Sequence, residues 1–311
     1  MRAAVEASAL GMRFGKTEAL RSVDLVVRQG EMFALVGPDG AGKSTLLRLA
    51  CGLLAPTSGT LRILGLDPAR ELERIKRQIG YFSQGFTLYG DLSVDENIEF
   101  FAEIHGVPQY RERRERLLEF TRLAPFRRRL ADRLSGGMKQ KLALACTLVH
   151  QPALLLLDEP TSGVDPVSRR DFWAILARLL ADGITILLTT PYLDEAERCT
   201  RVGLLQNGRL LDADTPTALR AGLPGKVLEV VCPEVRRAFA LLKRQPGLKE
   251  IQIFGDRLNI LLEGGEGQEA PLREALEREG LRVTAWREVP PRLENVFISR
   301  MRAERGEHAH G

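Results

Sequence analysis

The spacing of apolar and polar positions predicts strands and turns over residues 1–85, interrupted by one helix that starts at Gly42. Gln29-Gly30 lies between two apolar stretches and predicts a hairpin turn at that point. Alternating strands joined by short polar turns are typical of a sheet. We therefore expect the chain to open with a strand-rich layer.

A helical insert is predicted from Asp91 onward, where apolar residues begin to recur at helical spacing. Ser93 and Glu96 have the three-residue separation of a capping box, which marks a helix start. The helical pattern continues through the arginine-rich residues 111–133 and into a further helix opened by Ser135. The arginines could approach anionic lipid headgroups, but the pattern favours a solvated helical face with pairs four residues apart, such as Glu112 and Arg116.

Two continuous apolar runs, residues 153–157 and 184–189, each follow a predicted helix. Runs of this length without alternation are typical of parallel strands that are buried on both faces. Residues 202–211 predict a closing hairpin over Asn207-Gly208. The first part of the chain, residues 1–220, is therefore predicted to be an α/β domain with a helical subdomain at about 86–150.

A second, smaller domain is predicted over residues 226–300, after a linker at 215–225. Its elements follow the order β-α-β-β-α-β of a small α+β ferredoxin-like domain. They are a strand at 227–232, a helix at 234–245, strands near 248–254 and 257–263, a helix at 270–279 and a strand at 281–287. Residues 302–311 are predicted to be a disordered tail.

Composition narrows the class of protein without deciding the activity. With 44% hydrophobic and 28% charged residues, the chain is typical of globular proteins, and its apolar runs fall well short of the roughly 20 residues that cross a bilayer. The start does not resemble a secretory leader, so a cytoplasmic location is expected. The four cysteines form no CxxC pair and are expected to be buried thiols. A net charge of +4, spread through both signs, indicates no particular partner.

A phosphate-binding loop is predicted between the strand at 32–36 and the following helix, where the sequence fits GxxxxGK[ST]. Glycines allow close backbone approach to an anion, and the helix start directs free N–H groups at it. Lys43 is expected to reach the terminal phosphates of ATP, and Ser44 to supply a hydroxyl to Mg²⁺. The residues of this predicted site are Gly37, Pro38, Asp39, Gly40, Ala41, Gly42, Lys43, Ser44 and Thr45.

Two carboxylates, Asp158 and Glu159, directly follow the apolar run at 153–157. Phosphoryl transfer depends mainly on positioning and on stabilisation of charge. We expect Asp158 to hold Mg²⁺, directly or through water, and Glu159 to act as the general base that polarises the attacking water. An acidic pair after a strand is a weak signal alone, but it gains weight beside a phosphate loop.

A third motif, residues 134–140 with the sequence LSGGMKQ, distinguishes this chain among ATPases. Ser135 can cap a helix, and Gly136 and Gly137 permit close backbone approach, which predicts a second anion-binding helix end. The motif resembles the signature of ABC ATPases, and the resemblance covers roughly residues 3–220. It implies an ABC-type P-loop core with a mixed sheet, and a head-to-tail dimer in which each ATP lies between one subunit's phosphate loop and the other's signature helix.

The resemblance also assigns roles to residues outside the three motifs. It implies that Phe14 stacks on adenine, although an isolated phenylalanine is equally compatible with the core. It also implies that Gln84 senses the γ-phosphate beside Mg²⁺ and links to a membrane partner. Asp165 would bridge the two subunits in the D-loop, residues 162–165. A groove for a helix of the membrane subunit would be lined by Phe86, Leu88 and Tyr89, although each of these aromatic or apolar residues is also compatible with the core.

One position departs from the family pattern. The segment around Thr190-Pro191 resembles the switch segment, but Pro191 stands where the family has histidine. Proline offers neither a donor nor a proton carrier to the γ-phosphate. We therefore expect slow hydrolysis, or hydrolysis that depends wholly on Glu159, and pairing with a different ATPase subunit becomes an open alternative to a homodimer.

Residues 291–297 resemble the tail of ATPases from ABC-2-type exporters of drugs and antibiotics. This implies a separate transmembrane permease as partner, a place on the inner face of the cell membrane, and no nucleic acid. Two other interpretations stay open: a catalytically weak regulatory subunit, and a non-transport ABC ATPase. The latter usually has two cassettes or a long coiled-coil insertion, and neither is found here.

Overall fold

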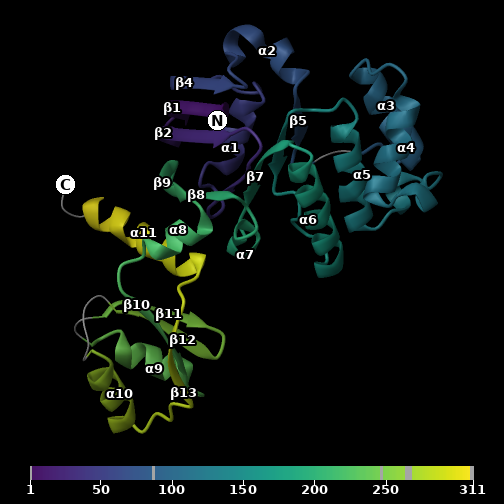
Figure 1. Cartoon of the computed structure of the whole chain (residues 1–311). Coiled ribbons are helices and arrows are strands. Elements are labelled where there is room, and N and C mark those ends of the chain that lie inside the picture. Colours follow the sequence, from purple (N-terminus) through teal and green to yellow (C-terminus); the bar gives the residue numbers. More distant parts are fainter. Residues whose placement is uncertain (1, 86–87, 246–247, 263–267, 309–311) are drawn as a thin grey trace. The chain divides into compact units, whose positions relative to one another are not determined.

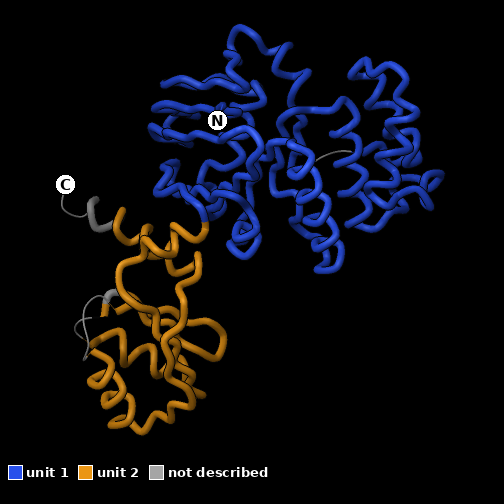
Figure 2. The backbone as a smooth tube through the Cα atoms, in the orientation of Figure 1, with its two compact units in different colours: residues 1–215 blue, residues 216–311 orange. Residues whose placement is uncertain are grey.

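The computed structural model describes residues 2–85, 88–245, 248–262 and 268–308 of the chain. It divides into two compact units, Met1–Thr215 and Pro216–Gly311, shown in blue and orange in Figure 2. The division falls a few residues before the predicted end of the first domain at 220. The reason is that the short helix α8 (Pro216–Ala221) packs against the last helix of the second unit.

A six-stranded sheet forms the centre of the first unit, in the order β5-β6-β7-β3-β8-β9. All neighbouring pairs are parallel except β8 and β9, which form the predicted hairpin over Asn207-Gly208. The two apolar runs are β6 and β7 and are buried throughout, as their lack of alternation predicts. The strands are β3 (Met32–Val36), β5 (Ile79–Phe82), β6 (Leu154–Asp158), β7 (Thr185–Thr190), β8 (Arg201–Gln206) and β9 (Arg209–Asp214).

A separate antiparallel sheet has the order β2-β1-β4, with β1 at Ala3–Phe14, β2 at Thr17–Arg28 and β4 at Ser58–Ile63. The predicted hairpin across Gln29-Gly30 is wrong, because β2 and β3 belong to different sheets. β2 alternates between buried and exposed positions, whereas all of β3 is buried. A strand that is buried on one face and a strand that is buried on both faces belong to different sheets, so the chain passes from one sheet to the other at Gln29-Gly30. The tight hairpin turn lies instead between Phe14 and Thr17, where β1 pairs with β2.

The helices of the first unit include a helical insert of α3, α4 and α5, which gather at one side of this unit in Figure 1. The predicted capping box at Ser93 and Glu96 is confirmed. The helical stretch at 111–133 is shorter than predicted: α4 ends at Thr121, because Arg122 takes a left-handed conformation (φ 58°), and two 3₁₀ turns follow. The helices are α1 (Lys43–Ala50), α2 (Pro68–Lys76), α3 (Val94–Ile104), α4 (Tyr110–Thr121), α5 (Gly136–Leu148), α6 (Pro166–Ala181) and α7 (Leu193–Ala196).

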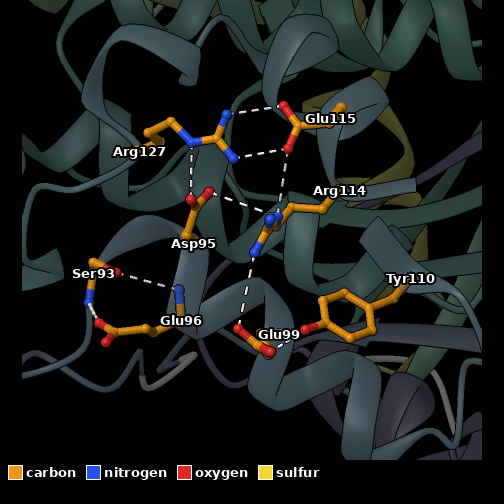
Figure 3. A network of polar contacts seen from close by, with 8 residues as sticks. All are labelled: Ser93, Asp95, Glu96, Glu99, Tyr110, Arg114, Glu115 and Arg127. Carbon is orange, nitrogen blue, oxygen red and sulfur yellow. Dashed lines mark hydrogen bonds and ion pairs between the residues drawn. The ribbon is translucent and has the colours of Figure 1, made fainter. Parts of the chain in front are cut away.

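Two of the insert's arginines, Arg114 and Arg127, bind acidic side chains of the same chain (Figure 3). Arg127 donates to Asp95 Oδ2 at 2.8 Å and, with two nitrogens, to Glu115 at 2.7 and 2.9 Å. This contact lowers the pKa of the Glu115 carboxyl. Arg114 lies 3.8 Å from both Asp95 and Glu99. The network ties α3 to α4 and to the segment that follows, so these two arginines serve the insert itself.

The second unit contains a four-stranded antiparallel sheet in the order β11-β12-β10-β13. Read in chain order, its elements form β-α-β-β-α-β, which is compatible with the predicted ferredoxin-like arrangement. The last strand begins four residues later and ends two residues later than predicted. Its elements are β10 (Lys226–Val231), α9 (Val235–Leu242), β11 (Leu248–Phe254), β12 (Arg257–Leu262), α10 (Glu269–Arg278) and β13 (Ala285–Val289).

The prediction of a disordered tail from residue 302 is wrong for residues 302–308, because α11 extends over Leu293–His308. The side-chain oxygen of Asn295 accepts from the Arg292 backbone N–H at 2.9 Å at the start of this helix. Leu293 and Val296 are fully buried and α11 packs against α8, so tertiary contacts support a helix that local polarity does not predict. Residues 309–311 lie outside the described part of the chain.

Within the described ranges, no helix combines the length and the apolar character that crossing a membrane requires. All four cysteines are free and buried, as predicted. Burial raises the pKa of the Cys51, Cys146 and Cys199 thiols, which keeps them protonated and unreactive.

Candidate nucleotide site

The predicted phosphate loop joins β3 to α1, and its glycines are required by the backbone. Gly40 and Gly42 have φ of 78° and 105°, in the left-handed region that favours glycine. At Gly37 a Cβ would lie 2.1 Å from the carbonyl oxygen of Leu205. The exposed part of the loop is formed by Pro38, Asp39 and Gly40, while Ala41 is buried. The loop therefore has the close-wrapped form that its motif predicts.

Lys43 folds back over this loop. Its side chain is only 4% exposed, and its Nζ donates to the carbonyl oxygens of Gly37 at 2.8 Å and Pro38 at 3.1 Å. The same nitrogen lies 3.5 Å from Glu159 Oε1. A buried ammonium group needs such partners. Lys43 therefore contacts both the loop carbonyl groups and the predicted general base, Glu159.

Asp158 ends β6 and is 1% exposed. Its Oδ1 accepts hydrogen bonds from Ser44 Oγ at 2.9 Å and from Thr189 Oγ1 at 2.7 Å. A carboxylate and a hydroxyl held side by side are hard oxygen donors that fit Mg²⁺, which takes few protein ligands and completes its shell with water and phosphate oxygens. Thr45 follows Ser44 in the first turn of α1 and is half-buried.

Glu159 has a positive φ of 48°, which is uncommon for a residue with a side chain. Its backbone N–H donates to both the hydroxyl and the carbonyl oxygen of Thr189, at 3.0 and 3.2 Å. Its Oε2 accepts from Gln84 Nε2 and Ser162 Oγ, each at 3.2 Å. Backbone strain of this kind persists where surrounding contacts hold it, and it recurs at functional sites. The structure thus brings Lys43, Gln84 and Glu159 together from three separate segments.

The predicted signature residues start α5. Ser135 Oγ accepts from the Met138 N–H at 3.4 Å, and both Ser135 and Gly136 are exposed. Gly137 packs closely on α6, since a Cβ there would lie 2.2 Å from Ser168 Oγ. The first amide groups of a helix have no partner within the helix, so this end offers N–H donors at the surface.

Three further predicted residues have distinct placements. Phe14 ends β1 and is 47% exposed, which is not the environment of a core residue. Asp165 caps α6 by accepting from the backbone N–H groups of Val167 and Ser168 at 3.0 and 2.9 Å, and the Ser168 contact lowers the pKa of its carboxyl. Pro191 directly follows the last residue of β7.

The predicted groove for a membrane partner is described in part. Tyr89 is exposed and meets Phe100 edge to face, with ring centroids 4.5 Å apart. Leu88 and Gln84 line a pocket of about 340 Å³ whose opposite wall is α5, at Lys139 and Gln140. Phe86 lies outside the described residues.

The sequence interpretation missed the residues that hold these groups in place, Thr189, Thr161 and Glu195. Thr189 binds both carboxylate-bearing residues, and Glu195 accepts hydrogen bonds from Thr161 and from Thr190. The signal for Thr189 was available: polar residues at the carboxyl end of a buried parallel strand lie where α/β sheets bind ligands. Glu195 had no such signal.

A larger pocket of about 900 Å³ lies away from these residues, lined by the end of α2, residues 104–109, the start of α4 and residues 149–151. In it the rings of His105 and His150 stack with centroids 4.0 Å apart. Burial and the neighbouring His150 lower the pKa of His105 to about 4. His150 Nε2 lies 2.8 Å from the Ile79 carbonyl oxygen, so this pair connects the insert to the start of β5.

Comparison with known proteins agrees with these motifs. The model of the ABC transporter family matches residues 20–162. The Nod factor export ATP-binding protein I of Rhizobium sp. (strain N33) is 36% identical over 300 residues, covering 95% of this chain and 96% of the relative. The chain belongs to the ABC transporter ATP-binding family.

Other members of the ABC family are similar over different shares of their length. The probable multidrug ABC transporter ATP-binding protein YbhF of Escherichia coli (strain K12) is 40% identical over 284 residues, which is 90% of this chain. The chain spans about half, 48%, of that relative's length. Among solved structures, the dimeric ATP-binding cassette MJ0796 bound to ADP and Pi matches with a TM-score of 0.61 and 30% identity, over 68% of this chain and 98% of that one.

Proposed function

We propose that this chain is the ATP-binding subunit of an ABC exporter, which hydrolyses MgATP in a head-to-tail dimer and moves a separate permease of the ABC-2 type. The observation that carries the proposal is the meeting of Lys43, Gln84, Asp158 and Glu159 in one cluster, while the signature end of α5 is exposed on the same unit. The names of the relatives, multidrug and Nod factor export, support export as the direction. A cytoplasmic place on the inner face of the membrane is part of the proposal.

The residues divide the work of hydrolysis between binding and activation. The loop amides and Lys43 would bind the β and γ phosphates. Ser44 and Asp158 would hold Mg²⁺, which supplies positive charge to the phosphate oxygens when bound. Glu159 accepts a proton from the water that attacks the γ-phosphorus, and Gln84 holds the carboxylate of Glu159 in place. Because Lys43 and Glu159 are already paired at 3.5 Å, the phosphates would draw Lys43 away and free Glu159 to bind the water.

A second candidate function is a catalytically weak regulatory subunit that pairs with a different ATPase. Pro191 favours it, because proline has no side-chain donor for the γ-phosphate at the position that follows β7. In that case the chain alone would bind ATP but hydrolyse it slowly. Mixing the chain with an ABC ATPase subunit that has histidine at the switch position would raise turnover above the sum of the two.

The head-to-tail arrangement predicts that two defective variants complement one another. Lys43→Ala and Ser135→Arg each damage both sites of their own dimer. In a mixed dimer one site carries both defects, and the other has an intact Lys43 and an intact Ser135. Each variant alone should lose nearly all ATPase activity, and a one-to-one mixture should regain about a quarter of the wild-type rate, because half of the dimers are mixed and each has one intact site.

The measurement is phosphate release, with dimer formation in ATP followed by light scattering. Wild-type protein and each single variant at the same total concentration are the controls. If mixed dimers form and the mixture is no more active than the two variants alone, sites shared between subunits are ruled out for this chain.

A further inference from the structure

A buried carboxylate lies beside the proposed site without belonging to it. Glu195, on α7, is 2% exposed. Its Oε1 accepts from Thr161 Oγ1 and its Oε2 from Thr190 Oγ1, both at 2.7 Å. Hydrogen bonds to an ionised acceptor are short and strong, so each oxygen of this carboxylate holds one threonine.

The two threonines belong to two segments that adjoin Glu159. Thr161 lies two residues after Glu159, in the loop that leads to the D-loop. Thr190 is the last residue of β7 and precedes Pro191, and its hydroxyl also accepts from the Tyr192 N–H at 3.1 Å. Glu195 therefore connects the loop that follows the catalytic carboxylate to the switch segment.

Arg169 supplies the charge that such a burial requires. Its Nε lies 3.5 Å from Glu195 Oε1, and its guanidinium carbon lies 4.9 Å from the centre of the Tyr192 ring. Arg169 belongs to α6, whose N-terminal cap is Asp165 of the D-loop. A buried carboxylate destabilises the fold unless it is paired. Glu195 is paired with Arg169 on the helix that follows the D-loop and with Thr190 in the switch segment.

We propose that Glu195 is a positioning residue that makes the switch segment and the loop after Glu159 move as one body. The proposal rests on the proposed hydrolysis at Glu159. Because Pro191 has no side-chain donor, the placement of the backbone decides how the switch segment meets the γ-phosphate at this position. The hydrogen bond from Thr190 to Glu195 fixes the backbone of the switch segment, and the hydrogen bond from Thr161 to Glu195 ties that segment to the loop after Glu159.

Glu195→Gln tests the role in turnover. The amide keeps the shape but replaces one accepting oxygen with a donor, so one threonine loses its acceptor. We expect kcat to fall about tenfold and the KM for ATP to change less than about twofold, because a positioning residue acts on the transition state and touches no substrate. The matched control is Asp194→Asn on the same helix, an exposed residue that should leave both constants unchanged. Equal kinetics for the two variants would overturn the proposal.

Thr190→Val and Thr190→Ser separate positioning from general damage. Valine removes the hydroxyl at similar size and should reproduce the loss in kcat, whereas serine keeps the hydroxyl and should restore it. Two outcomes would show that Glu195 serves the fold alone. In the first, Thr190→Val lowers the melting temperature and its loss in kcat equals the fraction of protein that is unfolded. In the second, Thr190→Ser does not restore kcat.

Hydrogen exchange of the nucleotide-free chain tests the coupling without any hydrolysis, so a failure of the proposed function would not affect it. Thr161→Val changes the loop after β6, yet it should raise amide exchange in residues 190–196 at least about threefold, because Glu195 loses one of its two anchors. Unchanged exchange in residues 190–196, with increased exchange confined to the mutated loop, would show that the segments move independently.

Discussion

The phosphate-loop region and the signature region of the first unit differ in how far the chain completes them. Lys43 and Asp158 are almost fully buried, and each is bound by other residues of the same chain. Ser135 and Gly136 are exposed at the start of α5. The first region is therefore organised before any nucleotide or partner arrives, whereas the second presents donors toward something outside its own chain.

The two regions also differ in the backbone strain that they contain. The phosphate-loop region holds Glu159 at a φ of 48° and Gly42 at 105°, and neighbouring segments such as β7 keep these conformations in place. The signature region is an ordinary capped helix start. Changes in the first region should therefore affect the chemistry directly, and changes in the second should act on hydrolysis through the contact with the partner's nucleotide site.

The largest effect is expected for Glu159→Gln, which keeps the size of the side chain but removes the base of the first region. We expect kcat to fall at least about 100-fold, the usual contribution of a general base, while ATP still binds and the ATP-bound dimer accumulates. Phosphate release and light scattering measure the two effects, and Glu119→Gln on the exposed surface of α4 is the control. Turnover within tenfold of wild type would remove Glu159 from its proposed role.

A smaller effect is expected for Pro191→His, which adds the donor that the first region lacks. Turnover should rise about threefold to tenfold, since one added hydrogen bond to the transferred phosphoryl group is worth about 1 kcal/mol. Pro191→Ala is the control, because it removes the proline without adding an imidazole. An equal gain in both variants would mean that the proline ring, and not the missing donor, limits the rate; no gain in either would count against the explanation from Pro191.

The smallest effect concerns acid stability beside the signature helix, where His105 stacks on His150. A folded pKa of about 4 lies below the ordinary value of 6.5, so the unfolded chain binds more protons between these two pH values and stability falls as the pH drops through this window. From pH 7 to pH 5 we expect His105 to contribute a loss of about 1 kcal/mol, after discounting for the solvent exposure of the ring.

His105→Gln carries no titrating group and should lose correspondingly less stability over the same pH range. Urea unfolding of both proteins at the two pH values gives the difference. Identical acid sensitivity of variant and wild type would place the pH dependence elsewhere in the chain.

Much of the candidate site could be predicted because its motifs are local. A glycine-rich turn between a buried strand and a helix, a carboxylate pair at a strand end and a capped SGG helix start each depend on a few consecutive residues. The helix and strand types of the first unit followed from periodicity for the same reason. The failures were also systematic: the turn at Gln29-Gly30 looks like a hairpin until β3 is placed in another sheet, and α11 looks polar until Leu293 and Val296 are buried.

The amino-acid sequence by itself determined which groups this ABC protein can use on a nucleotide, since a loop glycine, a lysine and a strand-end carboxylate act through backbone geometry and charge that neighbouring residues specify. Tertiary structure alone decided which residues hold those groups. Thr189 reaches Asp158 and Glu159, and Glu195 reaches Thr161, only because β6 and β7 lie side by side and α7 packs against β7 and β3. Contacts between residues about 30 positions apart leave no periodic trace in the chain, because they depend on strand order and packing.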